Sequence, residues 1–265
     1  SASWWLRRLG IEHVVLERGR VGERWRSERW DGFYLNTPNW TLQLPGFPYA
    51  GPSPDAFASL PETIAYLEDY ARAFQSPVRE NTPVQRVRRE EGGFLVDSPA
   101  ATIRARQVVV AAGAYQRPTP SPLAHALPPG VMSLHTSEYR RPNQLPDGAV
   151  AIVGSGQSGC QIAEELLGAG RRVYLFVSRC TWLPRRYRGR DLMSWMIESG
   201  LAEQTVETLP SPAARLACNA PVSGNDGGHD CNPRTLARDG AFLLGRLESV
   251  EGSVLRAGDT LAESL

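Results

Sequence analysis

The chain contains no lysine, because all 29 basic side chains among its 265 residues are arginine. Schiff-base catalysis needs a lysine amine, and the Walker-type phosphate loop needs a lysine beside the phosphates. The absence of lysine therefore excludes both classes of enzyme for this chain.

A long apolar run and a strong net charge are also missing. A helix that crosses a bilayer needs about 20 predominantly apolar residues, and no such run is present. The formal net charge of +1 gives no general attraction for nucleic acid or for an anionic membrane. We therefore expect a cytoplasmic protein that binds neither, and its oligomeric state stays open.

Cysteine is scarce, and the four cysteines show no C-x-x-C spacing. This pattern excludes a disulfide framework and a redox pair of the disulfide-reductase type, so we expect reduced thiols. The cysteines are Cys160, Cys180, Cys218 and Cys231.

The chain begins at Ser1 without a signal peptide and does not end naturally at Leu265, which predicts a fragment of a longer protein.

A dinucleotide-binding pattern is present in the second half. An apolar strand from Ala149 leads into G-x-G-x-x-G at Gly154, Gly156 and Gly159, and an amphipathic helix and a second strand follow. The first glycine permits a tight turn, the second lets the backbone approach a pyrophosphate, and the third allows close helix packing. We expect cofactor contacts from Gly154, Ser155, Gly156, Gln157, Ser158 and Gly159.

The end of the following strand indicates which nicotinamide cofactor binds. An NAD site usually places an acidic residue there, but this sequence has Ser178 and Arg179. A hydroxyl and a guanidinium favour a 2′-phosphate, which predicts NADPH. Arg185 and Arg186 either add to the same phosphate pocket or belong to a solvated basic loop.

The first residues repeat the second half of this pattern. A helix over residues 2–9, capped by Gly10, precedes a strand that ends before Glu17. Because Gly159 lies eleven residues before Gly170, the same spacing places the equivalent glycine two residues before Ser1. Glu17 then has the position of a ribose-binding acid, roughly 20 residues after the loop. The alternative is an exposed carboxylate after a strand.

Two such units, one ending in an acid and one in an arginine, indicate two different dinucleotides, FAD and NADPH. We predict an α/β protein with two Rossmann-like domains of three-layer architecture. Residues 1–141 form a partial FAD-binding domain that lacks its first strand and glycine loop. Residues 142–265 form an NADPH-binding domain, truncated before the chain returns to the FAD domain.

Three further predictions concern local structure. The spacing of apolar residues predicts a helix over 60–74, and alternation around Gly92 predicts a β-hairpin. The run from Gln107 to Gly113 predicts a buried strand. The loop from Asn225 to Cys231 holds residue types that bind metals, but its glycines favour a simple turn.

The order of several segments, among them "VVLERG", "GERWR", "LNTPNWTLQLPGFPY", "VVVAAGAYQRP" and "VGSGQSG", resembles the flavin-containing monooxygenases and their bacterial FAD-dependent relatives. The likeness extends over essentially the whole chain. It implies NADPH reduction of FAD, addition of oxygen at flavin C4a, and transfer of oxygen from the hydroperoxide to a small N or S nucleophile or a carbonyl substrate. Alternatives are an NADPH-dependent flavin oxidoreductase without oxygen insertion and a flavin-free fragment that binds only NADP or nothing.

The resemblance also implies roles for individual residues. It places an amide that faces the flavin or its oxygen adduct at Asn36, nine residues before Pro45, although Asn36 is equally explained as a loop cap. His135 and Tyr139 match part of the family's linker motif; Tyr139 favours N- or S-oxygenation, and His135 is a hydrogen-bonded linker residue or a proton carrier. The FAD contacts that the resemblance implies are Glu17, Arg18, Trp25, Arg26, Thr37, Val84, Ala112 and Gly113.

Overall fold

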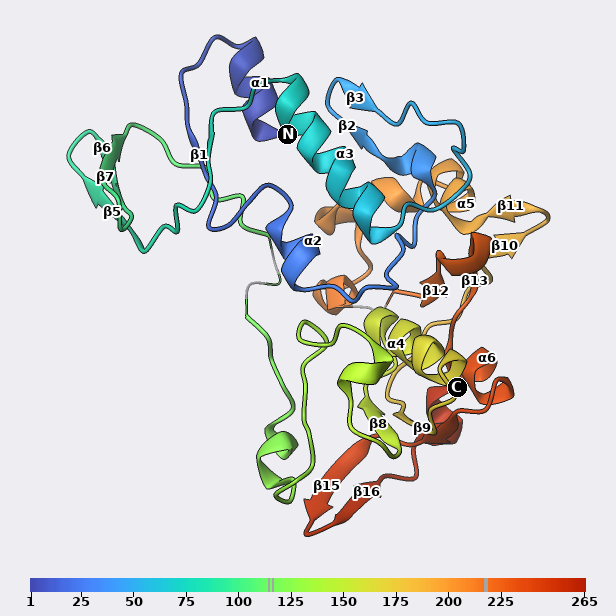
Figure 1. Ribbon diagram of the computed structural model, residues 1–265. Helices are drawn as coiled ribbons and strands as arrows, with labels where there is room; N and C mark the ends of the chain where they lie inside the picture. The colour runs from blue at the N-terminus through green and yellow to red at the C-terminus, as the bar shows by residue number, and fades with distance from the viewer. Residues whose placement is uncertain (114, 116, 217–218) are drawn as a thin grey trace.

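The computed structural model describes residues 1–113, 115, 117–216 and 219–265 (Figure 1). Cys218, one of the cysteines expected to be reduced, lies outside the described residues. The chain forms an N-terminal half around α3 (Leu60–Ala73) and a second half around a parallel sheet, with α4 (Gln157–Gly168) between them in Figure 1. No described helix combines the length and hydropathy that a bilayer span requires.

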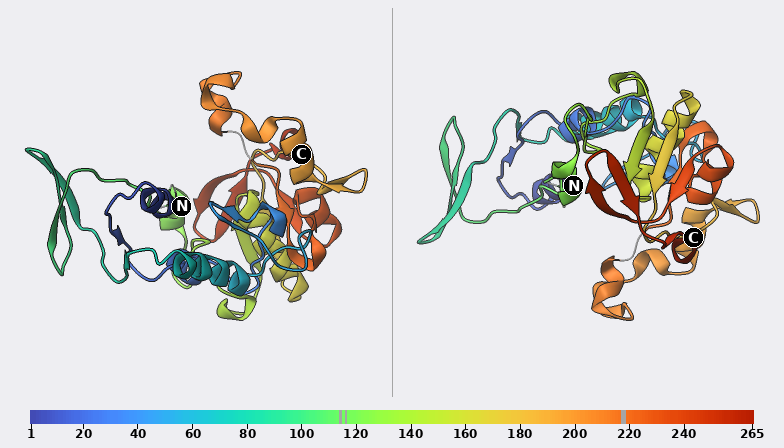
Figure 2. Two further views of the ribbon diagram at one scale, coloured as in Figure 1. Left: turned by 90° about the horizontal axis from the view of Figure 1, so that it is seen from above. Right: turned by 90° about the horizontal axis from the view of Figure 1, so that it is seen from below.

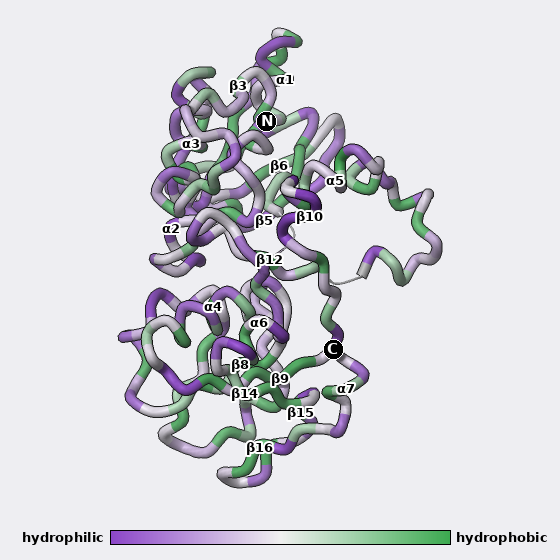
Figure 3. The backbone as a smooth tube through the Cα atoms, turned by 90° about the vertical axis from the view of Figure 1, so that its right-hand side faces the viewer, coloured by the Kyte–Doolittle hydropathy of each residue, from purple (hydrophilic) through white to green (hydrophobic). Residues whose placement is uncertain are grey.

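A three-stranded parallel sheet forms the core of the second half. Its strands are β8 (Val150–Val153), β9 (Val173–Phe176) and β14 (Phe242–Leu244), in the order β14-β9-β8. Figure 3 shows hydrophobic residues concentrated along these strands. The strand–helix–strand unit predicted for this part of the chain is confirmed.

Helix α4 packs on this sheet through residues spaced three or four positions apart. Cys160, Ala163 and Leu166 are completely buried, and so are Val173 and Leu175 of the central strand. The spacing puts these side chains on one helix face, and their burial fixes α4 against the sheet. The start of α4 is thereby held at the carboxyl end of β8.

The sheet is flanked by short elements from the last part of the chain. The hairpin of β15 (Leu247–Glu251) and β16 (Val254–Ala257) extends beyond it, and α6 (Pro233–Arg238) and α7 (Leu261–Ser264) lie near the C-terminus in Figure 1. The side chain of Asn232 caps α6 by accepting from two backbone amides of its first turn.

The N-terminal half is mainly helix and loop. Its helices are α1 (Ala2–Arg8), α2 (Glu23–Ser27) and α3; its short strand pairs are β1 (Val15–Leu16) parallel to β4 (Val78–Arg79), and β2 (Gln43–Leu44) antiparallel to β3 (Phe47–Pro48). The predicted first helix is confirmed, and Gly10 follows it with a φ of 66°, a left-handed conformation that suits glycine. The predicted helix over residues 60–74 is confirmed as α3.

A three-stranded antiparallel meander projects from the N-terminal half in both views of Figure 2. It consists of β5 (Arg86–Glu90), β6 (Gly93–Asp97) and β7 (Thr102–Ala105). The first two strands are the hairpin predicted around Gly92. Short 3-10 turns follow at η2 (Pro122–Ala126) and η3 (Pro142–Gln144).

The predicted buried strand over residues 107–113 is wrong. No strand is assigned there, and Val109 and Val110 are 67% and 83% exposed. A buried strand needs neighbouring strands to satisfy its backbone and cover its side chains. No described strand pairs with Val108, Val109 or Val110, so their apolar sequence alone does not make a strand.

One segment of the second half lies beside the N-terminal half in Figures 1 and 3. It contains two antiparallel strand pairs, with α5 (Leu192–Glu198) following the first pair, and 3-10 turns from η4 (Leu201–Glu203) to η7 (Asn225–Gly227). The pairs are β10 (Arg186–Tyr187) with β11 (Arg190–Asp191), and β12 (Val222–Ser223) with β13 (His229–Asp230).

Candidate dinucleotide site

The glycine-rich turn between β8 and α4 has the geometry that its spacing predicts. Gly154 has a φ of 108°, which side chains rarely adopt. A Cβ atom on Gly159 would lie 2.0 Å from the carbonyl oxygen of Gly154, so only glycine fits there. A Cβ on Gly156 would meet no atom within 4 Å. The second glycine therefore leaves the backbone open to an approaching group.

Two other residues of the turn, Gln157 and Ser155, have different roles. The Gln157 side chain exchanges two hydrogen bonds with the Val222 backbone, at 2.5 and 3.2 Å, so it anchors the turn to β12. Ser155 is buried, and its Oγ has no hydrogen-bond partner among the described residues. A buried hydroxyl without a partner is unfavourable, and a phosphate oxygen would supply an acceptor.

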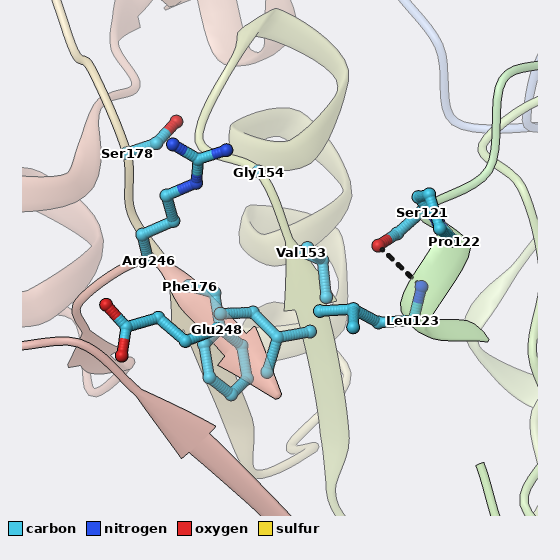
Figure 4. Close-up of a pocket in the computed structure, with 10 residues that line it drawn as sticks. Ser121, Pro122, Leu123, Val153, Gly154, Phe176, Ser178, Arg246 and Glu248 are labelled. Carbon is cyan, nitrogen blue, oxygen red and sulfur yellow. Dashed lines mark hydrogen bonds between the residues drawn. The ribbon is translucent and has the colours of Figure 1, made fainter. Parts of the chain in front are cut away.

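A pocket of about 600 Å³ lies at the carboxyl ends of β8 and β9. Ligands of open α/β sheets bind at this edge. The residues that line the pocket come from four separate segments of the chain, and Figure 4 shows the Arg246 guanidinium directed toward Gly154 and beside Ser178. The lining residues are Ser121, Pro122, Leu123, Val153, Gly154, Phe176, Ser178, Arg246, Leu247 and Glu248.

Arg246 is the one basic residue among those that line the pocket, and sequence reasoning missed it, as it missed most of the lining. It follows β14, far along the chain from the glycine turn, and it is exposed. Within the described residues its guanidinium has no ion pair or hydrogen bond. The signal available in the sequence was only an arginine after an apolar run, which gives no information about what it faces.

The arginines predicted near this site have different environments. Ser178 lines the pocket and Arg179 is exposed next to it. Arg185 is 2% exposed, and its guanidinium forms an ion pair with Asp191 and donates to the Asn36 carbonyl. Neither sequence-based expectation for Arg185, a phosphate contact or a solvated loop, fits this burial. Arg186 donates to two backbone carbonyls of the loop before β13.

The residues around Glu17 form a compact loop after β1. The Glu17 carboxylate accepts from the Gly19 amide at 2.9 Å, and the Glu17 carbonyl accepts from the Thr82 amide. Arg18 is largely exposed and lies 3.7 Å from Glu28. The acid is therefore oriented by its own loop at the end of a parallel strand, as a ribose-binding residue would be.

The remaining predicted flavin residues are dispersed. Trp25 packs against Phe33, with ring centroids 5.7 Å apart, and Arg26 forms an ion pair with Glu68. The Arg26 pair joins α2 to α3, and these two helices are in contact. Asn36 and Thr37 are half-buried in one loop, whereas Val84, Ala112 and Gly113 are exposed.

The predicted linker residues join the two halves. The buried Tyr139 hydroxyl donates to Glu165 Oε2 of α4 at 2.6 Å. Burial raises the pKa of the Glu165 carboxyl, although the hydrogen bond from Tyr139 opposes this shift. His135 Nδ1 lies 2.8 Å from the Ser137 hydroxyl. This contact matches the hydrogen-bonded linker histidine among the two predicted roles.

The loop before β13 is a tight turn. Asp226, Gly227 and Gly228 all have positive φ angles, and His229 pairs with Glu164 of α4. No group of three potential metal ligands occurs among the described residues.

Residues 1–212 match the family described as "Pyridine nucleotide-disulphide oxidoreductase". This chain belongs to that family. A relative from Geobacillus kaustophilus named "Uncharacterized oxidoreductase CzcO-like" is 38% identical over 248 residues, which cover 93% of this chain and 68% of the relative. The family and this relative are both described as oxidoreductases, which is the general class of enzyme that the sequence resemblance predicted.

Solved structures support the fold. A mutant flavin monooxygenase from Stenotrophomonas maltophilia aligns with a TM-score of 0.71 at 22% identity, covering 97% of this chain and 69% of that structure. A structure of OTEMO in complex with FAD and NADP aligns with a TM-score of 0.52 at 22% identity, covering 76% and 42%. The predicted dinucleotide-binding α/β fold is confirmed, and the predicted cofactors, FAD and NADPH, agree with the family and with OTEMO. The chain spans only part of each relative.

Proposed function

We propose that the pocket beside Gly154 binds NADPH and that the whole protein is an NADPH- and FAD-dependent monooxygenase of small N- or S-containing substrates. One observation carries the proposal: an unpaired guanidinium and an open glycine turn face the same pocket at the edge of a parallel sheet. An acidic residue at the end of β9 would repel a 2′-phosphate, and Ser178 occupies that position.

The described residues fit NADPH in three respects. The backbone at Gly156 is open, so the pyrophosphate can approach the start of α4, where amide groups and the helix dipole favour an anion. The Ser155 hydroxyl lacks a partner. Arg246 and the hydroxyl of Ser178 supply a cation and a donor for the 2′-phosphate, with the exposed Arg179 adjacent.

The FAD-facing residues fit in part. Glu17 would accept from the adenosine ribose, and the Asn36 amide would orient toward the isoalloxazine ring. Arg18, Trp25, Thr37, Val84, Ala112 and Gly113 are proposed to border the cofactor. When bound, the flavin takes a hydride from NADPH and supports oxygen transfer to the substrate. The residues of this chain bind and orient the two cofactors and shield them from water.

A disulphide-reductase activity of Cys160 and Cys231 is disfavoured by the surroundings of the two thiols. Cys160 and Cys231 are completely buried, and burial raises the pKa of both thiols. Reactive thiols need the opposite, a lowered pKa and access to the partner disulfide. We therefore propose oxygen, rather than a disulfide, as the final electron acceptor.

The nucleotide assignment is tested by calorimetric titration of Arg246→Met with NADPH and NADH. Loss of a charge-assisted contact to the 2′-phosphate should weaken NADPH binding by about tenfold or more and leave NADH binding unchanged. Arg256→Met is the matched control, because this exposed arginine pairs with Glu251 in the neighbouring hairpin. Equal losses for NADPH and NADH would contradict the assignment.

The oxygenase assignment needs the full-length protein with FAD. Stopped-flow spectra after mixing the reduced protein with oxygen should show a transient flavin species before the oxidised spectrum returns. Direct reoxidation without a transient would favour the NADPH-dependent reductase, and a colourless purified protein would favour the flavin-free nucleotide-binding alternative.

A further inference from the structure

Arg185 is the most deeply buried charged side chain of the described residues and connects segments that are far apart in the sequence. It is 2% exposed. Its Nε lies 2.9 Å from Asp191 Oδ2, and its Nη1 donates to the Asn36 carbonyl oxygen at 2.6 Å. The guanidinium carbon lies 4.3 Å from the centroid of the Phe57 ring. The side chain therefore contacts an acid, a backbone carbonyl and an aromatic face together.

Arginine suits this combination better than lysine. Its planar guanidinium presents donors in fixed directions while its face stacks on an aromatic ring. Asp191 compensates the buried charge with Oδ2 and caps α5 with Oδ1, which accepts from the Met193 amide at 2.8 Å. The position of the guanidinium is consequently fixed by the start of α5.

A second contact holds the same loop from another direction. A Cβ atom on Gly224 would lie 1.8 Å from the carbonyl oxygen of Leu35 and 3.0 Å from the Phe57 Cβ. The backbone after β12 therefore packs directly on the residue before Asn36. On its other side the Leu35 amide donates to the Ala58 carbonyl at 2.8 Å. The loop is held by three separate segments.

We infer that Arg185 is a positioning residue for Asn36: it fixes the backbone carbonyl of Asn36 and so directs the Asn36 amide toward the flavin. The inference rests on the proposed function, in which Asn36 faces the flavin. Arg185 itself does not touch a cofactor in this arrangement. It links the flavin-facing loop to the β10–β11 and α5 segment, which is contributed by the second half of the chain.

The test uses the full-length protein and the variant Arg185→Met, with hydrogen exchange of residues 33–41 as the first readout. We expect faster exchange in this segment, because the tether on Asn36 is lost. With FAD bound, kcat should fall by about tenfold while the KM for NADPH stays unchanged, as expected for misplacement of one group at the flavin. Arg185→Lys, which retains the positive charge beside Asp191, should fold and show an intermediate effect.

Arg190→Met is the matched control, because Arg190 lies in the same hairpin and pairs with Glu198 at the surface. It should leave exchange and kcat unchanged. Unchanged exchange of residues 33–41 in both Arg185 variants would overturn the tether, and faster exchange with an unchanged kcat would overturn the positioning role. Exchange measured without nucleotides tests the tether even if NADPH or FAD fails to bind, so the failure of the proposed function is recognised separately.

Discussion

The three glycines of the turn before α4 have different physical reasons to be glycine. Gly154 needs its positive φ, Gly159 lies against a carbonyl oxygen, and Gly156 has empty space in front of its α-carbon. Only the last of these reasons is a matter of ligand binding. Substitutions can therefore separate folding from nucleotide affinity within one short turn.

Gly156→Ala and Gly159→Ala form a matched pair. Gly159→Ala should lower the free energy of unfolding by about 1–3 kcal/mol, since the new methyl group overlaps the Gly154 carbonyl. Gly156→Ala should change it by less than about 1 kcal/mol and weaken NADPH binding, because the methyl group occupies the approach of the pyrophosphate. Urea unfolding and calorimetric titration measure the two effects. Normal NADPH affinity in Gly156→Ala would contradict the proposed site.

At the residue scale, the sequence predicted the backbone conformation correctly where neighbouring residues determine it. The glycine turn and the cap at Gly10 follow from backbone geometry, which neighbouring residues determine. Arg185 and Arg246 were not predictable in this way, because their partners come from distant segments. An arginine in a loop has the same local sequence whether it ends up buried against Asp191 or facing a pocket.

At the scale of elements, hydrogen bonds between Ser59 and Glu62 stabilise the first turn of α3. The Ser59 amide and hydroxyl donate to the Glu62 carboxylate at 2.8 and 2.7 Å. These hydrogen bonds favour the charged carboxylate, and the pKa of Glu62 is lowered from its ordinary value of 4.5. The stabilisation is therefore complete above that value and is lost as the pH falls through the lower pKa of the folded state.

Glu62→Ala should lower the free energy of unfolding by about 1 kcal/mol at neutral pH, as expected for loss of a helix cap. The difference from the unchanged protein should shrink as the pH is lowered below the ordinary pKa of a glutamate. Asp69→Ala is the control, since Asp69 lies on the same helix and pairs with the exposed Arg72. Urea unfolding at several pH values measures both variants, and a pH-independent difference would refute the role of the Glu62 charge.

Helices and the hairpin were predicted from periodicity and turn residues, because local sequence determines both. The strand predicted over residues 107–113 was wrong because a strand depends on partners as well as on its own sequence. Apolar composition shows that a segment is suited to burial, but a strand forms only where partners are present. No such partner pairs with Val109 or Val110 within the described residues.

At the scale of the whole molecule, the family and the dinucleotide-binding unit from β8 to β9 were predictable from the sequence, and the arrangement of the two halves was not. The segment with α5 leaves the second half and lies beside the first (Figure 1). Its contact with the Asn36 loop depends on a buried ion pair and on a glycine that packs against a carbonyl. Such contacts carry no periodic signal. The boundary predicted near Pro142 separates two parts of the sequence, whereas these contacts join the two parts in the folded molecule.

The exposed valines have a consequence for how this chain behaves at high concentration. Residues 107–112 combine high β-propensity with no charge and no proline, which is the composition of segments that stack between molecules into amyloid-like sheets. Val110→Arg should slow thioflavin-positive aggregation, whereas Val131→Arg, at another exposed valine, should not. Equal aggregation of both variants would show that another segment drives the aggregation. An exposed segment with the composition of a strand can pair with the same segment of another molecule, so the aggregation rate reports whether this segment is covered.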